Sequence, residues 1–252
     1  MTEPTPAADL LTEARRLHQN AQAAGIAARL LGGAAVAISA PAPLPPALQR
    51  SYKDLDYVVR RSDAPRWRDL LDTNGYTADI QFNTLHGAQR LLHYDLVNER
   101  QIDTFVSNFA MCHSLELEDR LPPGSATLAP ADILLTKLQI YEVNDKDLID
   151  SIAVLLSHPI ISTSGGPGIE TTRLTKVTGA DWGWHTTLTD NLTKVTQRLP
   201  TAGLTSEQND VVAQRIEQIT TALAAAPKSL KWRARAKVGR RVPWYDLPEE
   251  VG

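Results

Sequence analysis

Two aspartates at the start of an apolar, β-branched segment constrain the fold of this chain more than any other feature. The segment reads Lys53-Asp54-Leu55-Asp56-Tyr57-Val58-Val59. On a strand, the side-chain period of two places Asp54 and Asp56 on one face. Two ionised carboxylates held close together repel each other, so a fold that keeps them there usually holds a cation between them. The alternative is a strand whose exposed end carries two solvated charges, and the pair alone does not exclude it.

A glycine pair lies upstream of these aspartates. Ile26 to Leu31 is predicted to be a short buried strand that stops at Gly32-Gly33, and the segment from Ala34 can begin a helix. Glycines after a strand let the backbone turn tightly and approach a ligand, and the free N–H groups at a helix start attract phosphate. Most such glycine pairs are simple turns, so this pair indicates a ligand site only in combination with the aspartates that follow it in the chain.

A third aspartate lies downstream, early in a predicted strand from Gln101 to Ser107. That strand can lie beside the strand of Asp54 and Asp56, and Asp103 would then add a carboxylate to the same site. An aspartate that merely ends a strand is the alternative. His93 lies on another predicted strand near this site, whereas the histidines as a set show no zinc-type spacing.

The remaining pattern predicts an α+β fold in which helices flank a mixed sheet and a mainly helical region follows. Helices are expected from Ala8 to about Ala24, from Ala64 to Thr73, from Pro130 onward and after Asn144. Three strands in a meander are expected at Tyr76–Phe82, Arg90–Tyr94 and Gln101–Ser107.

The composition changes near Pro159, and a Gly/Ser/Pro-rich linker runs from Ser162 to Gly168. We therefore predict a first domain over residues 1–158 and a helical accessory region over residues 159–252. Thr205 to Gln208 fits a capping box. The stretch from Pro227 to Tyr245 carries basic residues without an acidic one, with Trp232 and Trp244 among them. Such a stretch can bind a phosphate backbone and stack on bases, or it can be a solvated helix whose tryptophans pack on the domain.

Composition limits the class of protein. The chain has 252 residues, a net charge of −3 and one cysteine, Cys112. No disulfide can form within the chain, no overall positive charge favours nucleic acid, and no apolar run is long enough to span a bilayer. We expect a soluble, cytoplasmic protein that does not bind membranes.

Two charged residues on the predicted helices beyond Pro130 have two interpretations each. Lys137 can be an ordinary solvated helix lysine, and Asp147 can simply complement the positive end of its helix. On the residues alone, these ordinary interpretations are favoured.

Taken together, Gly32-Gly33-Ala34, Asp54-Leu55-Asp56 and Asp103 resemble the motif set of the nucleotidyltransferase (polymerase-beta-like) fold. Leu134-Leu135-Thr136-Lys137-Leu138-Gln139 and Lys146-Asp147-Leu148-Ile149-Asp150 resemble, more narrowly, the AbiEii/AbiGii toxin-like branch. The similarity covers roughly Ile26 to Leu156. The family often has Ser or Thr after its glycines, whereas this chain has Ala34, which leaves only backbone donors.

The resemblance implies transfer of a nucleoside monophosphate from NTP to an acceptor. Asp54, Asp56 and Asp103 would hold two Mg²⁺ ions, since hard cations prefer carboxylate oxygens. Gly32, Gly33 and Ala34, with Arg50 and Lys53 nearby, would bind the nucleotide. Lys137 would neutralise phosphate charge, and Asp147 would orient it or bind the acceptor.

Three functions remain open on this basis. The first is a Mg²⁺-dependent nucleotidyltransferase that acts on tRNA or another RNA 3′ end, toxin-like and with a possible antitoxin partner. The second keeps the chemistry but uses a small hydroxylated acceptor, such as an aminoglycoside. The third is a nucleotide- or partner-binding module without turnover. The intact carboxylates disfavour the third, and the basic C-terminal stretch favours RNA over a small molecule.

Overall fold

The computed structural model describes residues 5–121, 124–163 and 165–247. The chain divides into two compact units. Unit 1 consists of Met1–Ser39, Arg50–Phe109 and Leu115–Leu128, and unit 2 of Ala40–Gln49, Ala110–Ser114 and Ala129–Gly252. Positions 158 and 159, where we placed a domain boundary from the sequence, both lie within unit 2.

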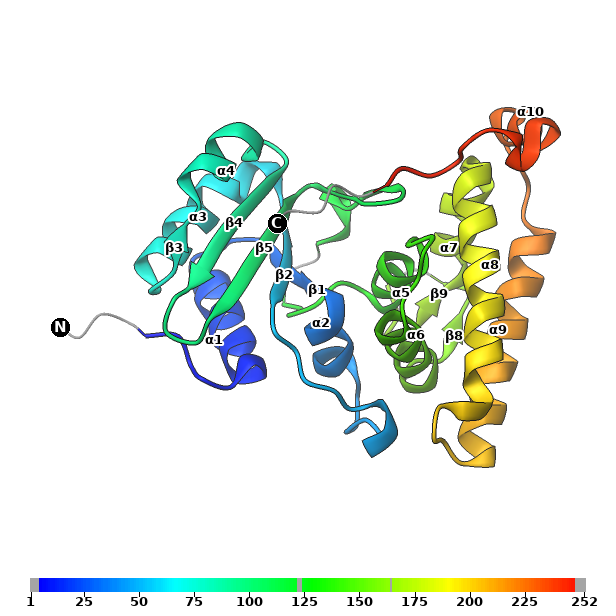
Figure 1. The fold of residues 1–252 in the computed structure, drawn as a ribbon, viewed down its shortest axis with the longest axis horizontal. Helices are drawn as coiled ribbons and strands as arrows, with labels where there is room; N and C mark the ends of the chain where they lie inside the picture. The colour runs from blue at the N-terminus through cyan, green and yellow to red at the C-terminus, as the bar shows by residue number, and fades with distance from the viewer. Residues whose placement is uncertain (1–4, 122–123, 164, 248–252) are drawn as a thin grey trace. The chain divides into compact units, whose positions relative to one another are not determined.

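Unit 1 is built on a five-stranded mixed sheet with strand order β1-β2-β5-β4-β3. The strands are β1 (Ala28–Leu31), β2 (Leu55–Val59), β3 (Thr77–Ala78), β4 (Arg90–Asp95) and β5 (Arg100–Val106). The β2–β5 pair is parallel, and the other pairs are antiparallel. The long β4–β5 pair is visible in Figure 1. The prediction that the strand of Asp103 lies beside the strand of Asp56 is therefore confirmed.

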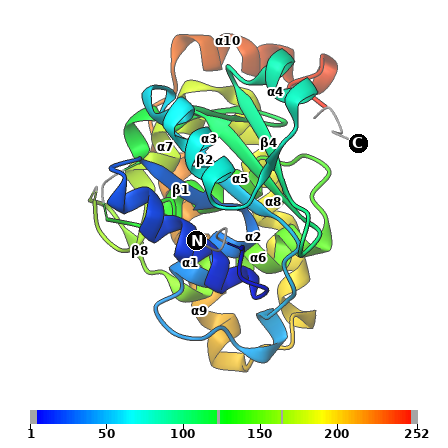
Figure 2. The ribbon, with the colours of Figure 1, turned by 90° about the vertical axis from the view of Figure 1, so that its left-hand side faces the viewer.

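The helices of unit 1 are α1 (Leu10–Ala23), α2 (Gly32–Ser39), α3 (Ala64–Thr73) and α4 (Ile80–His86). Helices α1 and α3 cover one face of the sheet (Figure 2). On that face the Tyr57 hydroxyl donates to the Ala14 carbonyl at 3.4 Å, and the Trp67 Nε1–H donates to Thr104 Oγ1 at 3.0 Å. Because side chains alternate along a strand, Asp56 and Asp103 point to the opposite face.

The segment Tyr76–Phe82 corrects the sequence prediction. We expected one strand there, but only Thr77–Ala78 pairs with β4, and α4 begins at Ile80. Asp79 acts as the N-cap of α4, because its side chain accepts a hydrogen bond from the Phe82 N–H at 2.9 Å. Tyr76 at the start of the segment is buried, but Ile80 is 73% exposed, so the buried face does not continue along the segment.

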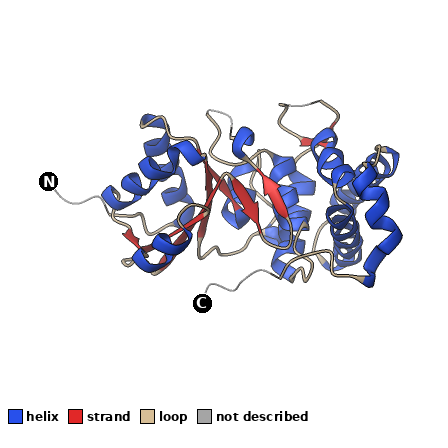
Figure 3. Cartoon of the chain, turned by 90° about the horizontal axis from the view of Figure 1, so that it is seen from above, coloured by secondary structure: helices blue, strands red, loops and turns tan. Residues whose placement is uncertain are grey.

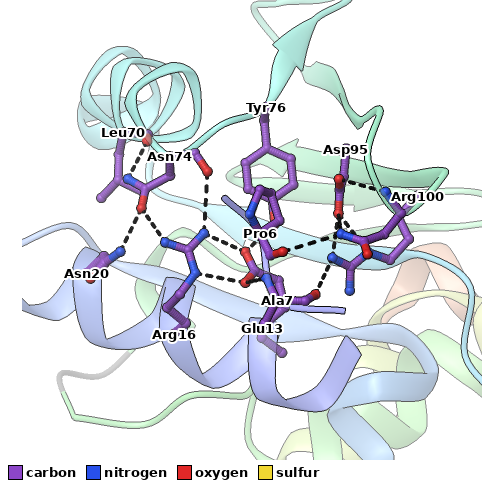
Figure 4. A network of polar contacts seen from close by, with 12 residues as sticks. Pro6, Ala7, Glu13, Arg16, Asn20, Leu70, Asn74, Tyr76, Asp95 and Arg100 are labelled. Atoms are coloured by element: carbon purple, nitrogen blue, oxygen red, sulfur yellow. Dashed lines mark hydrogen bonds and ion pairs between the residues drawn. The ribbon is translucent and has the colours of Figure 1, made fainter. Parts of the chain in front are cut away.

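A buried carboxylate fixes the N-terminal segment to unit 1. Glu13 on α1 is fully buried and accepts hydrogen bonds from the Ala7 N–H, from Arg16 and from the Tyr76 hydroxyl. Arg16 also donates to Asn74 Oδ1 at 2.7 Å, which ties α1 to the end of α3 (Figure 4). A charge that is buried with this many donors is compensated, so the network fixes the segment at Ala7 to α1.

Unit 2 is mainly helical (Figure 3). Its helices are α5 (Pro130–Leu138), α6 (Asp145–Ser157), α7 (Thr171–Ala180), α8 (Trp182–Arg198), α9 (Ser206–Ala225) and α10 (Leu230–Val238). Strands β8 (Ile160–Ile161) and β9 (Ile169–Glu170) form a small parallel pair around the predicted linker, of which Ser164 lies outside the described residues. Together with the mixed sheet, this confirms the predicted α+β class and the helical C-terminal region.

Short elements complete the fold. Strands β6 (Asn108–Ala110) and β7 (Ser114–Glu116) form a further two-stranded sheet. The 3₁₀ helices are η1 (Pro46–Leu48), η2 (Arg61–Asp63), η3 (Glu118–Arg120), η4 (Leu199–Thr201) and η5 (Gly239–Arg241). The predicted capping box at Thr205 and Gln208 is confirmed. Among the described residues, no helix is both long and apolar enough to cross a bilayer.

Candidate active site

Two of the predicted carboxylates lie on adjacent strands. Asp56 on β2 and Asp103 on β5 are register partners in the parallel pair, so their side chains share one face of the sheet. Asp56 is half-buried and Asp103 is buried. Asp54 directly precedes β2 and is exposed. Unit 1 therefore brings the half-buried Asp56 and the buried Asp103 together on one face of the sheet. The exposed Asp54, which sequence analysis also placed in the site, lies two residues before Asp56 in the chain.

The glycine pair lies against Asp56. Gly32 follows β1 with a φ of +69°, and a Cβ built on it would lie 2.0 Å from Asp56 Oδ2. A Cβ on Gly33 would lie 2.1 Å from Nη2 of Arg50. A side chain at Gly32 would displace the Asp56 carboxylate and would be strained at this φ, whereas one at Gly33 would displace the end of the Arg50 side chain. The next residue, Ala34, is buried in α2, so only its backbone is available to a ligand.

Arg50 and Lys53, predicted to bind nucleotide, line a cavity of about 600 Å³ within unit 1. Arg50 stacks on the Tyr52 ring, with its Cζ 4.6 Å from the ring centre, and Tyr52 lines the same cavity. The other walls come from the start of α1 and from the turn between β4 and β5. The cavity thus has both basic and acidic side chains in its walls, together with one aromatic ring, and Arg50 links it to Gly33.

The structure adds a residue that sequence analysis missed. Arg90, at the start of β4, donates from Nε to Asp103 Oδ1 at 2.8 Å and to Oδ2 at 3.0 Å, and its Nη2 also donates to Oδ2. This hydrogen bonding raises the pKa of Arg90. Burial raises the pKa of Asp103, against the opposing effect of Arg90. The only sequence signal was the strand register, because Arg90 and Asp103 share a face once β4 and β5 pair.

A second charged cluster lies in unit 2. Lys137 on α5 is buried, and its Nζ lies 2.9 Å from carboxylate oxygens of both Asp147 and Asp150 on α6. Burial alone would lower the pKa of Lys137, but Asp147 and then Asp150 raise it above its ordinary value. The interpretation of Lys137 as a solvated lysine is therefore wrong. The interpretation that Asp147 only complements the helix end is wrong as well.

The model of a family described as uncharacterised nucleotidyltransferase matches residues 6–151. The chain belongs to this family. The match spans the sheet of unit 1 together with α5 and most of α6.

Among solved structures, this chain is similar to an antigenic nucleotidyltransferase-like protein from Paracoccidioides brasiliensis. The two share 16% sequence identity, the TM-score is 0.43, and the match covers 90% of this chain and 97% of the other. A search among curated proteins found no match.

The carboxylates of this candidate site fit a hard cation in part. Asp54 and Asp56 offer carboxylate oxygens, and the missing Cβ of Gly32 lets Asp56 Oδ2 lie against the backbone at the start of α2. Asp103 differs, since both of its oxygens already accept hydrogen bonds from Arg90. Within the described part of the chain, no group of three or more His, Cys, Asp or Glu side chains is arranged to hold a metal ion.

His93, the histidine that sequence analysis placed near the site, lies elsewhere. Its register partner on β5 is Ile102, so its side chain points to the face opposite Asp103. It is fully buried, and its Nε2 lies 3.7 Å from Asp72 Oδ1. Burial lowers the pKa of His93 to about 4, which leaves the ring neutral at pH 7. His93 therefore belongs to the packing beneath the sheet.

Proposed function

We propose that this chain transfers a nucleoside monophosphate from NTP to an acceptor hydroxyl, with Mg²⁺ held at Asp54 and Asp56. The observation that supports this proposal most is the approach of Gly32 to Asp56. Gly32, which has no side chain, lies at the start of α2 and contacts the Asp56 carboxylate on β2, the strand beside β1. The free N–H groups at a helix start attract phosphate, and a carboxylate can hold the metal ion that a triphosphate carries. A metal-bound triphosphate needs the two groups next to each other.

In this reaction the acceptor oxygen attacks the α-phosphorus in line with the leaving group. A new phosphorus–oxygen bond forms, the bond to the bridging oxygen breaks, and pyrophosphate leaves while the acceptor proton passes to a base. Bound Mg²⁺ would stabilise the negative charge that gathers on the phosphate oxygens. The amides from Gly33 onward would bind phosphate oxygens, and Arg50 and Lys53 would neutralise the triphosphate.

For unit 2 we propose the roles that the resemblance to the AbiEii/AbiGii toxin-like branch implies. Lys137 would neutralise phosphate charge, and Asp147 would orient its ammonium group. The 2.9 Å contact between Lys137 Nζ and Asp147 supports the second role. A toxin-like action in the cytoplasm, with an antitoxin protein as its partner, belongs to the same proposal.

An RNA 3′ end is the proposed acceptor, supported by the basic residues of α10 and the turn after it. Trp232 and Trp244 are half-buried, and Arg235 and Arg240 stack on Trp182 and Trp244. These tryptophans and these two arginines therefore pack within the protein. Four basic side chains stay exposed and form no ion pair among the described residues, namely Lys231, Arg233, Lys237 and Arg241. Arg233 and Lys237, one turn apart, share a helix face and can contact successive phosphates.

The test is direct. Purified protein is incubated with Mg²⁺, total RNA and each NTP labelled at the α-phosphate, and RNA is separated from free nucleotide. We expect label in RNA with the wild-type chain, and background label with Asp56→Asn. If neither RNA nor any protein-dependent product carries label, the proposed activity is wrong.

The same assay separates the alternatives. Label on an added aminoglycoside but not on RNA would assign a small-molecule acceptor. Binding of NTP without transfer to either acceptor would indicate a module that has lost turnover.

A further inference from the structure

Arg90 and Asp103 form an ion pair on the face of the sheet that also carries Asp56. The guanidinium donates to both oxygens of Asp103, so the pair is bidentate. The Arg90 side chain is 23% exposed and that of Asp103 is 7% exposed. Bidentate pairs with little exposure hold a defined geometry better than single surface contacts do.

Aromatic rings further restrict where the guanidinium can lie. Its Cζ is 5.0 Å from the centre of the Phe105 ring and 5.9 Å from that of Phe82. Phe105 is the register partner of Arg90 across the β4–β5 pair, so the stacking follows from the sheet itself. Arg90 is therefore held by a carboxylate and by two aromatic side chains.

This position gives the site a permanent positive charge. Asp56 contributes to the field around Arg90, and it is the register partner of Asp103. A divalent ion that used Asp103 as a ligand would have to displace the N–H donors from both oxygens and remain beside the guanidinium. The divalent ion and the Arg90 guanidinium would both contact Asp103, and two positive charges that close repel strongly when they are partly removed from water.

We propose that Arg90 takes the place of the second metal ion that the sequence implied. Asp54 and Asp56 then hold a single divalent ion, and Asp103 is a positioning residue that keeps the guanidinium beside it. The formal charges support this arrangement, since three carboxylates, one guanidinium and one divalent ion cancel in the protein without nucleotide. The inference rests on the cation site of the proposed function but not on turnover.

The experiment counts Mn²⁺ ions bound to the full chain without nucleotide, from the loss of the free-ion signal in electron paramagnetic resonance. We expect one ion per wild-type chain and none with the double variant Asp54→Asn/Asp56→Asn. Arg90→Gln releases Asp103 and should bind two ions. Arg90→Lys keeps the positive charge and should bind one.

A variant with the same net charge as the wild type controls for misfolding of the single variants. Arg90→Gln/Asp103→Asn removes the pair as a unit, so it leaves no buried charge without a partner. We expect it to bind one Mn²⁺ with a Kd within about threefold of the wild type.

Two ions on the wild-type chain, or none, would overturn the inference. Loss of the ion from the charge-matched variant would overturn it as well, because Asp103 would then be a ligand. One bound ion without nucleotide transfer would leave this inference standing while the proposed function fails.

Discussion

Gly32 has a backbone φ of +69° and passes so close to Asp56 that a Cβ would lie 2.0 Å from Oδ2. Two separate penalties therefore act on any substitution there. The left-handed backbone conformation disfavours residues with a Cβ by about 1–2 kcal/mol. The contact with Asp56 adds an effect on the site itself, because the carboxylate has to move.

Gly32→Ala should therefore lose both stability and cation binding. Gly124 is the matched control, since it has a φ of +84° and nothing within 4 Å of a built Cβ. We expect both variants to lose about 1–2 kcal/mol of unfolding free energy in urea. Only Gly32→Ala should bind Mn²⁺ at least tenfold more weakly. Equal Mn²⁺ affinities for the two variants would show that the site tolerates a side chain at Gly32.

His93 makes stability depend on pH. Burial lowers its pKa from 6.5 to about 4, so between these values the unfolded chain binds the proton and the folded chain does not. Stability is therefore complete above pH 6.5 and is lost as the pH falls toward 4. One proton corresponds to a slope of about 1.4 kcal/mol per pH unit.

We expect His93→Leu to flatten the curve of unfolding free energy against pH by about this slope between pH 4.5 and 6. The control is His86→Leu, because His86 is exposed on α4. Urea unfolding at several pH values measures both. A slope unchanged in His93→Leu would show that the folded protein protonates His93 as readily as the unfolded chain does.

At the scale of elements, a buried ion pair joins α5 to α6. The Lys137 side chain is 11% exposed, and the Asp150 side chain is 2% exposed. Removing the ammonium group leaves two carboxylates without their shared cation. Breaking a buried pair in this way typically destabilises a protein by about 3–5 kcal/mol.

Lys137→Ala should accordingly lower the unfolding free energy by about 3–5 kcal/mol. Lys146→Ala is the control on α6, because an exposed helix lysine contributes no more than about 0.5 kcal/mol. Chemical denaturation of both variants decides the matter. A loss below about 1 kcal/mol for Lys137→Ala would return Lys137 to the role of a solvated lysine.

Local patterns predicted most of the elements, and long-range contacts account for what they missed. Strand β2, helix α3 and the starts of α5 at Pro130 and of α6 after Asn144 follow from nearby residues, and the structure has them. At Tyr76–Phe82 the N-cap of Asp79 outweighed the β propensity of the segment. The position of Arg90 against Asp103 depends on the β4–β5 register, and the burial of Lys137 depends on how α6 packs. Neither is encoded within a single segment.

At the scale of the whole molecule, the charge distribution is uneven. The chain carries a net charge of −3, yet Lys231, Arg233, Lys237 and Arg241 are exposed and form no ion pair among the described residues. Phosphate contacts release counterions, so binding of single-stranded RNA should weaken as salt rises. Each contact contributes about −0.7 to the slope of log K against log salt.

Arg233→Ser/Lys237→Ser should therefore reduce the steepness of this slope by about 1.4 and weaken RNA binding at low salt. The control Arg15→Ser/Arg68→Ser removes the same charge from exposed positions on α1 and α3, and should leave the slope unchanged. Filter binding over a salt series measures both. Equal slopes for the two double variants would contradict an RNA interface on α10.

The parallel pairing of β2 with β5 also bears on how the protein forms. Elements α3, β3, α4 and β4 all lie between the two strands in the chain. Asp56 and Asp103 therefore become neighbours only after a long loop has closed, and contacts of this kind form slowly. A nascent chain that has not yet exposed β5 carries the Asp54–Asp56 motif but neither Asp103 nor its partnership with Arg90. The pairing of Asp56 with Asp103 is thus expected late in folding, and a chain released before that point would lack the Arg90–Asp103 ion pair.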